Sequence, residues 1–144
     1  MSSTRSKGRL VLLHIDDSSE DRLLVKVAIK TTQTPFVAYG AADPAAAALF
    51  FQAHHPTEND QQPRPAIVLL DYDLGLHTCA EFLYWLRVQK QITSIPVVLY
   101  SACLDEDHLQ KCYALGADHC LRKAHTLARL SAIVRTLQLC MSFA

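Results

Sequence analysis

The sequence predicts an α/β protein in which a five-stranded parallel sheet is covered by helices on both faces. Short apolar runs rich in Val, Ile and Leu, bounded by polar residues, are typical of buried parallel strands. Segments with helical spacing of apolar residues alternate with these runs, as in consecutive βαβ units. The apolar runs also lead directly into polar side chains, at the position where ligands bind in open α/β sheets. The 144 residues are expected to form one domain, since domains commonly contain about 100–200 residues.

The first expected strand covers about residues 9–15 and is followed by a helix. Ser18 can cap that helix, and Asp21 three positions later completes a variant capping box. Four apolar residues at helical spacing are expected to face the core: Leu23, Leu24, Val27 and Ala28.

The second strand and helix are shorter and are followed by a loop. Residues 36–39 form the expected strand. Asp43 followed by Pro44 supplies an N-cap and a proline in the first turn, so an alanine-rich helix is expected to extend to about residue 55. Residues 56–65 combine polar residues with prolines and are expected to form a loop.

The second half of the chain repeats the order of strand and helix three times. The expected strands cover residues 66–70, 96–100 and 119–122, and a helix is expected over about residues 78–89. The acids at 105–107 suit the positive end of the next helix, and Gly116 is a natural stop for it. One stripe of the last helix should be buried: Leu127, Leu130, Val134, Leu137 and Met141.

The composition argues against several kinds of partner and compartment. The net charge is zero, so nothing favours attraction to nucleic acid or to anionic membranes. No apolar run approaches the roughly 18 residues that a membrane-spanning helix needs. The five cysteines are odd in number and contain no Cys-x-x-Cys pair, which favours reduced thiols and a cytoplasmic protein. Residues 1–8 are polar and are expected to be a disordered lead-in to a single domain over residues 9–144.

Five polar side chains follow the expected strands and should meet at one edge of the sheet. They are Asp16 and Asp17 after the first strand, Asp71 after the third, Ser101 after the fourth and Lys123 after the fifth. Neighbouring carboxylates repel one another, and a hard divalent cation such as Mg²⁺ relieves this repulsion. With a hydroxyl and an ammonium group beside it, such a metal forms a receptacle for phosphoryl oxygens. The residues therefore predict phosphoryl transfer, for which a carboxylate such as Asp71 is a suitable covalent acceptor.

Four motifs, in this order, closely resemble the receiver domains of two-component response regulators. They are Ile15-Asp-Asp-Ser18, Leu70-Asp-Tyr-Asp-Leu74, Leu99-Tyr-Ser-Ala102 and Gly116-Ala-Asp-His-Cys-Leu-Arg-Lys123. The resemblance spans about residues 9–139 and implies a single flavodoxin-like (βα)5 domain with strand order 2-1-3-4-5. That order places the acids of the first and third strands at the point where the strand order reverses.

The resemblance also implies a role for each member of the polar set. Asp71 is the expected phosphoacceptor, Ser101 takes the place of the switch serine or threonine, and Lys123 takes that of the invariant lysine. The implied Mg²⁺ ligands are Asp17 directly, Asp16 mainly through water, Asp71, and the backbone carbonyl of Asp73.

The chain departs from the family pattern at three places. The Pro, Asp and Gly that usually follow the phosphoacceptor motif are replaced by Gly75, Thr78 and Cys79, which predicts a loop of different shape. Ala124 replaces the proline that follows the lysine, often after a cis bond, and an alanine peptide strongly favours trans. Cys120 occupies the position of the aromatic switch residue, so output through an aromatic rotamer change is not expected.

In functional terms, the resemblance implies a stand-alone receiver that accepts a phosphoryl group from a sensor histidine kinase. Pro63-Arg-Pro65, together with Ala124, is similar to receivers that partner bacterial phytochromes. Signalling is expected through altered contacts with a downstream protein, and a homodimer is consistent with the resemblance. Self-catalysed phosphotransfer and dephosphorylation are expected, without turnover of a dedicated substrate.

Two alternatives stay open. Asp71-Tyr-Asp73 after an apolar strand also resembles the nucleophile and acid–base pair of haloacid-dehalogenase-type phosphatases, although that family usually places its metal-binding acids last. The altered loops and Cys120 are also compatible with a degenerate receiver that acts as an interaction module without being phosphorylated.

Several further side chains allow more than one interpretation. His108 and Cys112 lie four positions apart, with His119 and Cys120 further on, but structural zinc sites usually have tighter paired spacing. Buried thiols and surface imidazoles are therefore expected, and His14 is expected to be a satisfied interior histidine.

Apolar side chains beyond the core stripes indicate contact surfaces. Because other residues suffice for the core of the helix at 78–89, Tyr84 and Trp85 either face outward or pack against a neighbouring helix or loop. Ile133 and Cys140 indicate an apolar surface of the kind used in dimers.

Overall fold

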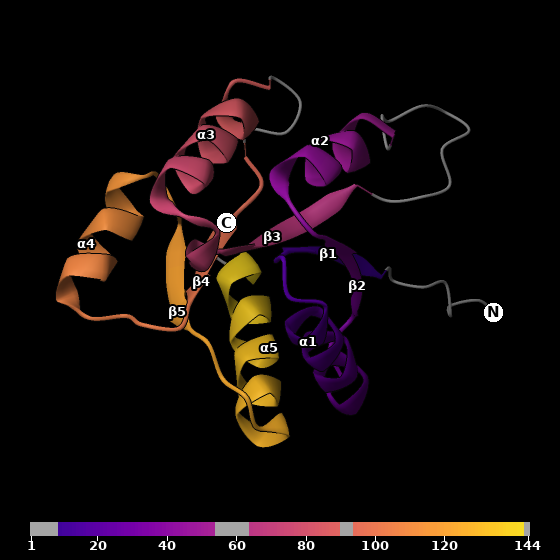
Figure 1. The fold of residues 1–144 in the computed structure, drawn as a ribbon. Helices are drawn as coiled ribbons and strands as arrows, with labels where there is room; N and C mark the ends of the chain where they lie inside the picture. The colour runs from indigo at the N-terminus through magenta and orange to yellow at the C-terminus, as the bar shows by residue number, and fades with distance from the viewer. Residues whose placement is uncertain (1–8, 54–63, 90–93, 143–144) are drawn as a thin grey trace.

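The computed structural model describes residues 9–53, 64–89 and 94–142, which form one sheet covered by helices on both faces (Figure 1). The expected lead-in at residues 1–8, and all but the last two residues of the loop expected at 56–65, lie outside the described residues. The strands are β1 (Leu10–Ile15), β2 (Phe36–Ala41), β3 (Pro65–Asp71), β4 (Val97–Ser101) and β5 (His119–Arg122). They pair in parallel in the order β2-β1-β3-β4-β5, which confirms the predicted flavodoxin-like topology.

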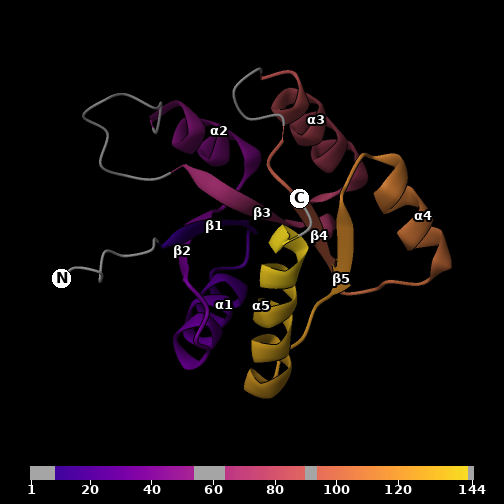
Figure 2. The ribbon, with the colours of Figure 1, turned by 180° about the vertical axis from the view of Figure 1, so that it is seen from behind.

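Five α-helices and one 3₁₀ turn connect these strands in the described part of the chain. They are α1 (Ser19–Thr31), α2 (Pro44–Ala53), η1 (Tyr72–Leu74), α3 (Leu76–Arg87), α4 (Glu106–Ala114) and α5 (Leu127–Ser142). The side chains of Ser18 and Asp105 cap α1 and α4 by accepting hydrogen bonds from backbone N–H groups of the first turn. Helices α1 and α5 lie side by side on one face of the sheet, and α2, α3 and α4 cover the other (Figures 1 and 2).

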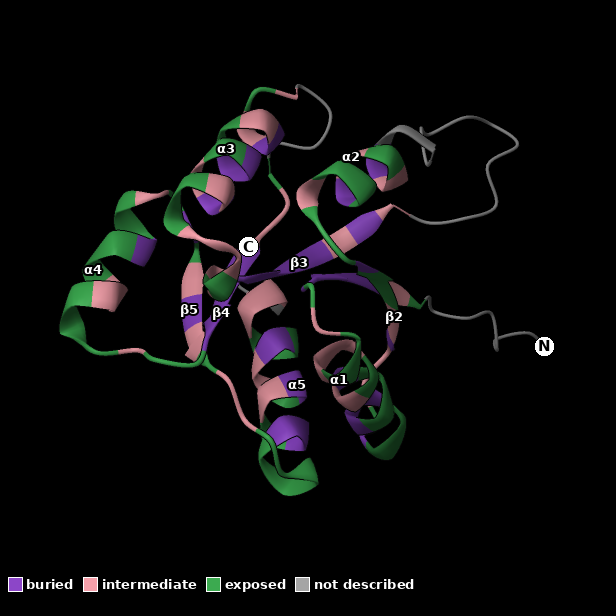
Figure 3. Ribbon diagram, in the orientation of Figure 1, coloured by how far each residue is buried: buried purple, intermediate pink, exposed green. Residues whose placement is uncertain are grey.

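The sheet is buried between two apolar layers (Figure 3). Successive residues of a strand face opposite sides, so Leu12 belongs to the layer under α1 and α5, and Leu13 to the layer under α2, α3 and α4. Both side chains are fully buried, which is why the strands read as continuous apolar runs. Within the described residues, no helix combines the length and apolar character that crossing a membrane requires.

The predicted core face of α1 is confirmed for Leu24 and Ala28, which lie in or against the apolar layer, and is wrong for Leu23 and Val27, which are 59% and 41% exposed. Val25 and Ile29 are buried in their place. The helix packs against α5 as well as against the sheet, and this second contact rotates the buried stripe away from the one that simple helical spacing predicts.

The last helix follows the predicted stripe except at its start. Leu130, Val134 and Leu137 are buried, but Leu127 is 47% exposed because it lies at the first residue of α5. Ile133 and Cys140 are half-buried and pack against the layer under α1 and α5, which gives them a role inside the fold.

The neighbouring aromatic residues Tyr84 and Trp85 of α3 have different surroundings. Tyr84 is 73% exposed, so its side chain lies on the surface. Trp85 packs against the rings of Phe51 and Phe82, with both ring centroids 6.0 Å away. The expected packing against a neighbouring helix is therefore found for Trp85, and the outward position for Tyr84.

Candidate functional site

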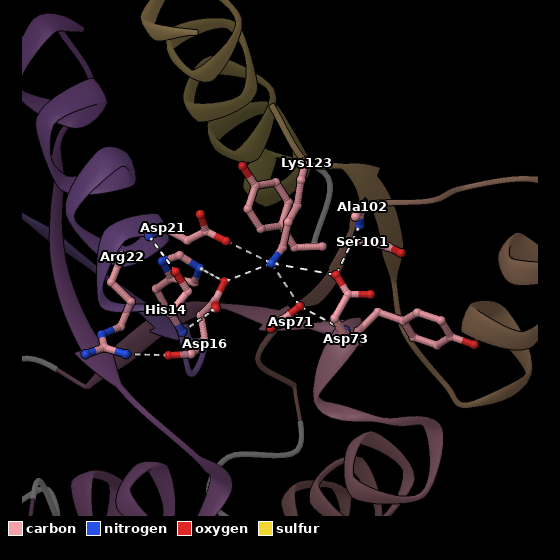
Figure 4. A network of polar contacts seen from close by, with 12 residues as sticks. His14, Asp16, Asp21, Arg22, Asp71, Asp73, Ser101, Ala102 and Lys123 are labelled. Atoms are coloured by element: carbon pink, nitrogen blue, oxygen red, sulfur yellow. Dashed lines mark hydrogen bonds and ion pairs between the residues drawn. The ribbon is translucent and has the colours of Figure 1, made fainter. Parts of the chain in front are cut away.

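The five side chains predicted from the strand ends come from one edge of the sheet. Figure 4 shows four of them: Asp16, Asp71, Ser101 and Lys123. Asp16 and Asp17 follow β1, Asp71 ends β3, Ser101 ends β4 and Lys123 follows β5. β1 and β3 are neighbours in the sheet, but the helices that follow them pack on opposite faces. The connections therefore separate at this point and leave a crevice at the carboxyl ends of the strands.

Lys123 lies at the centre of a group of carboxylates. Its Nζ is 3.1 Å from both Asp71 Oδ1 and Asp21 Oδ2, 3.2 Å from Asp16 Oδ2 and 3.8 Å from Asp73 Oδ2. The lysine side chain is only 7% exposed. Burial alone would lower its pKa, but the hydrogen bonds with Asp21 and Asp71 outweigh burial and raise the pKa above its ordinary value. The group therefore remains an ammonium ion.

Asp71 is a buried carboxylate that is held in place from two sides. Its Oδ1 accepts a hydrogen bond from the backbone N–H of Asp73 at 2.9 Å and contacts Lys123. Burial raises the pKa of Asp71 to about 6 against the opposing effects of these two groups, and the negative charge of Asp16 contributes to the rise. The Cys79 thiol donates to the Asp71 carbonyl oxygen at 3.3 Å, so the family's glycine position holds a side chain that contacts the phosphoacceptor backbone.

Asp16 is fully buried and its two carboxylate oxygens have different surroundings. Oδ1 accepts a hydrogen bond from the backbone N–H of Ser18 at 3.0 Å. Oδ2 lies 3.3 Å from His14 Nε2 and 3.2 Å from the Lys123 ammonium, but it has no partner in hydrogen-bond geometry among the described residues. Burial would raise the pKa of Asp16, but the contacts with His14, Ser18 and Lys123 lower it to about 2, so this carboxylate is ionised.

His14 corrects one expectation from the sequence. It is an interior residue, 1% exposed, and its ring packs edge-on against Tyr100 at 5.9 Å. Neither ring nitrogen has a hydrogen-bond partner among the described residues, so the expectation of a satisfied interior histidine is wrong. The sequence could not reveal this, because satisfaction depends on which polar groups α1 brings to the ring.

The acids of the crevice can hold a divalent ion. Oxygen atoms of Asp16, Asp17 and Asp71 all lie within 4.8 Å of one another. Lys123 supplies one positive charge against these acids and against Asp73, so the crevice is negatively charged. Asp16 Oδ2, which contacts Lys123 but has no partner in hydrogen-bond geometry among the described residues, fits a position that a cation would satisfy, and carboxylate oxygens are suitable ligands for hard divalent ions. We call Asp16, Asp17 and Asp71 the acid pocket.

Ser101 is buried at the end of β4 and is turned toward the connection between β4 and α4. Its hydroxyl donates to the carbonyl oxygen of Cys103 at 2.7 Å and accepts from the backbone N–H of the same residue at 3.2 Å. The Ser101 hydroxyl therefore fixes the first turn of this connection in the structure described.

The loop departures predicted from the sequence have structural counterparts. Gly75 has φ 113°, a conformation that side chains rarely adopt, and α3 begins at the next residue, two positions before the predicted start. The bond between Lys123 and Ala124 is trans, as predicted, since the described residues contain no cis peptide. The N–H that alanine retains donates to Tyr100 Oη at 3.5 Å.

The sequence did not predict the part that Asp21 plays in the site. Asp21 was assigned only a capping role, and its backbone N–H does donate to Ser18 Oγ, but its carboxylate also pairs with Lys123. The expectation of a buried thiol is confirmed for Cys112, which is fully buried. His108 instead lies beside Asp105, 2.7 Å away, and both lie near Cys103.

Comparisons with known proteins agree with this geometry. No protein-family model matches the chain. The response regulator Rcp1 of Synechocystis sp. is 29% identical over 136 residues, which cover 94% of this chain and 91% of Rcp1. The crystal structure of the Mn²⁺-bound form of Rcp1 matches 90% of this chain and 91% of its own, with a TM-score of 0.68 and 29% identity.

Two further solved structures match in fold. The response regulator RPA3017 in red light signalling of R. palustris is 19% identical, with a TM-score of 0.75 over 89% of this chain and 90% of that chain. The bacteriophytochrome response regulator RtBRR is 25% identical, with a TM-score of 0.68 over 90% of this chain and 78% of that chain. The chain is homologous to Rcp1, and its structure matches those of response regulator receiver domains.

Proposed function

We propose that this receiver domain, a homologue of Rcp1, accepts a phosphoryl group on Asp71 from a sensor histidine kinase. The observation that carries the proposal is the position of Asp71: a buried carboxylate at a strand end, 3.1 Å from a buried ammonium group and within 4.8 Å of two further acids. The similarity to a bacteriophytochrome response regulator supports a kinase of the phytochrome type.

The transfer step needs little covalent chemistry from the protein. A carboxylate oxygen of Asp71 attacks the phosphorus atom, the bond between phosphorus and the histidine nitrogen breaks, and the electron pair stays on the imidazole, which then takes up a proton. A phosphoryl group adds negative charge to a crevice that is already negative. Lys123, whose raised pKa keeps it charged, lies where it compensates part of this charge.

The same residues would hold a divalent metal, for which Mg²⁺ is the proposed ion. Asp17 and Asp71 would bind it directly, Asp16 mainly through water, and Asp73 through its backbone carbonyl. When bound, the metal neutralises charge on the phosphoryl oxygens. The existence of a Mn²⁺-bound form of Rcp1 supports the binding of a divalent ion by this chain.

Switching would require Ser101 to change partners. In the structure its hydroxyl donates to the Cys103 carbonyl, so donation to a phosphoryl oxygen on Asp71 requires release of that bond. Release would free the connection between β4 and α4 and change the surface offered to a downstream protein or to a second copy of the chain. Cys120, 9% exposed on β5, provides no aromatic ring for this response.

The proposal is tested by incubating the chain with acetyl phosphate and Mg²⁺ and measuring intact mass. Here the bond between phosphorus and the acetate oxygen breaks, and acetate leaves. One phosphoryl group is expected on the wild-type chain, and none on Asp71→Asn or after chelation of the metal. Asp107→Asn, on the exposed face of α4, is the matched control and should be labelled like the wild type. Labelling that survives Asp71→Asn overturns the assignment.

The comparisons give no support to the phosphatase alternative, because the relatives reported above are response regulators. The degenerate receiver is separated from the proposal by the same experiment, since it predicts neither labelling nor Mg²⁺ binding.

A further inference from the structure

A second group of metal-ligating side chains lies on the connection from β4 to α4, outside the acid pocket. It consists of Cys103, Asp105 and His108, which we call the loop cluster. Their ligand atoms all lie within 4.8 Å of one another. His108 Nδ1 is 2.7 Å from Asp105 Oδ1, and Cys103 Sγ is 3.8 Å from Asp105 Oδ2.

These separations are close to those of a tetrahedral metal site. Zinc binds nitrogen and oxygen at about 2.0–2.2 Å and sulfur at about 2.3 Å, which places neighbouring tetrahedral N and O ligands about 3.3 Å apart, and S and O ligands about 3.6 Å apart. The two separations differ from these values by roughly half an ångström and a few tenths of an ångström, respectively, although they involve different oxygens of Asp105. With the three ligand atoms within 4.8 Å of one another, a rotation of the carboxylate and small movements of the other two side chains would bring them around one ion.

Each of the three residues of the loop cluster is already held by contacts with its surroundings. Asp105 caps α4 by accepting the backbone N–H of His108 at 2.9 Å, and the His108 ring packs edge-on against Tyr72 at 5.6 Å. Cys103 is held through its backbone by the two hydrogen bonds with Ser101. This fixation lowers the entropy that ordering the ligands would cost.

The chemistry of the loop cluster differs from that of the acid pocket. A thiolate, an imidazole and one carboxylate are typical ligands of Zn²⁺, whereas Mg²⁺ prefers oxygen ligands alone. The side chains of His108 and Asp105 are 34% and 60% exposed, so a hydrated ion reaches them without opening the core. The fourth position is left for water.

We propose that Cys103, Asp105 and His108 bind Zn²⁺, or a first-row divalent ion of similar chemistry, independently of the acid pocket. The simpler interpretation is that His108 and Asp105 form an ordinary ion pair at the start of a helix. His77 and Glu81 provide a comparison, because they form a similar exposed pair at 3.1 Å that is not part of a three-residue metal-ligating group among the described residues.

Metal at the loop cluster would oppose switching, and this consequence rests on the proposed function. An ion bound to Cys103 holds the turn in which the Cys103 carbonyl accepts the Ser101 hydroxyl. A phosphoryl group on Asp71 requires the Ser101 hydroxyl to release the Cys103 carbonyl. The metal ion at the loop cluster and the phosphoryl group on Asp71 are therefore each expected to weaken the binding of the other, by the same factor of roughly five or more.

The site is tested by titrating Co²⁺, a spectroscopic substitute for Zn²⁺, into the full chain under reducing conditions with excess Mg²⁺ present. One equivalent should bind, with the sulfur-to-metal charge-transfer absorption of a thiolate ligand, and Zn²⁺ should displace it. Cys103→Ser should abolish this absorption, and His108→Gln should weaken binding at least about tenfold. Cys140→Ser and His77→Gln are the controls, and both should bind as the wild type does.

Absence of the thiolate absorption in the wild type, or its persistence in Cys103→Ser, overturns the site. This test is independent of the test of the proposed function. A chain that is phosphorylated but binds no Co²⁺ would support the proposed function and contradict the metal site. A chain that binds Co²⁺ but is not phosphorylated would support the metal site and contradict the proposed function. Loading the acid pocket with Mg²⁺ and beryllofluoride should weaken Co²⁺ binding in the wild type but not in Asp71→Asn. Equal Co²⁺ affinity with and without beryllofluoride in the wild type overturns the coupling.

Discussion

The acid pocket and the loop cluster lie on the two sides of Ser101 and use carboxylates in different environments. In the acid pocket Asp16 and Asp71 are buried, and Lys123 contacts both of them. In the loop cluster Asp105 is exposed and its partners are a thiol and an imidazole. Because Asp16 and Asp71 are buried, their charges affect the stability of the protein as well as its metal binding. Because Asp105 is exposed, metal binding at the loop cluster depends mainly on which ligand atoms its three side chains supply.

The same contrast appears in two ion pairs of equal length. Lys123 and Asp71 are 3.1 Å apart in the buried crevice, and Lys111 and Asp107 are 3.1 Å apart on the surface of α4. Distance alone does not distinguish them, but water screens only the second pair effectively. Each prediction below therefore pairs a buried group with an exposed counterpart.

The largest difference is expected in thiol reactivity. Burial raises the pKa of Cys79 to about 12, so at pH 8 only about one molecule in 10⁴ carries its thiolate there, whereas Cys103 is exposed. Cys103 should be alkylated by iodoacetamide at least ~1,000-fold faster than Cys79. Peptide mass mapping over time measures both rates, and Zn²⁺ should protect Cys103. Comparable rates would mean that the layer around Cys79 opens readily.

Removal of the buried ammonium should cost the most stability. Lys123→Ala leaves Asp16 and Asp71 without their shared cation and is expected to lower the free energy of unfolding by about 3 kcal/mol in the absence of metal. Lys111→Ala, the matched surface change, should lower the free energy of unfolding far less, because water screens the exposed pair. Urea unfolding measures both. Equal losses would contradict the contrast between the two regions.

Lys123→Ala should also separate phosphorylation from its consequence. Asp71 keeps its position and its neighbouring acids in this variant, so labelling by acetyl phosphate should persist. The change in oligomeric state or spectrum that beryllofluoride produces in the wild type should be lost. A full response in the variant would show that Lys123 is not needed for switching.

Mg²⁺ binding at the acid pocket should stabilise the protein by slightly less than Lys123→Ala destabilises it. At a Mg²⁺ concentration 100 times its Kd, the free energy of unfolding should rise by about 2.7 kcal/mol. Asp17 is exposed, so Asp17→Asn should leave the metal-free protein as stable as before while removing most of this gain. Thermal unfolding with and without Mg²⁺ separates the two effects. An unchanged gain in Asp17→Asn would exclude that residue as a ligand.

The smallest effect is expected at the helix cap of the loop cluster. Asp105→Ala removes the acceptor for the His108 backbone N–H and should cost about 1 kcal/mol, whereas Asp105→Asn retains an acceptor and should cost less. Both substitutions should weaken Co²⁺ binding. Chemical unfolding and the cobalt titration, carried out on the same two variants, measure the cap and the ligand separately.

The strand ends could be predicted from the sequence because neighbouring residues determine them. An apolar run followed by a charged residue indicates both the strand and the edge of the sheet at which the charged side chain lies. This pattern was enough to predict the positions of Asp16, Asp71 and Lys123. The buried face of α1 was wrong because it depends on contact with α5, which lies far along the chain. The ion pair of Asp21 and the loop cluster were missed for the same reason: which side chains meet depends on turns that spacing does not encode.

The strand order determines when, during synthesis, the side chains of the crevice can come together. Lys123 and Asp21 form an ion pair although they are 102 residues apart, and β1 pairs with β3 across the whole first crossover. Such long-range contacts form late and slowly in folding. A chain still in synthesis that has not yet released β5 therefore has the acids without their counter-ion. Because Lys123 is expected to be needed for the response and not for labelling, only a chain with the complete sheet should respond to phosphorylation.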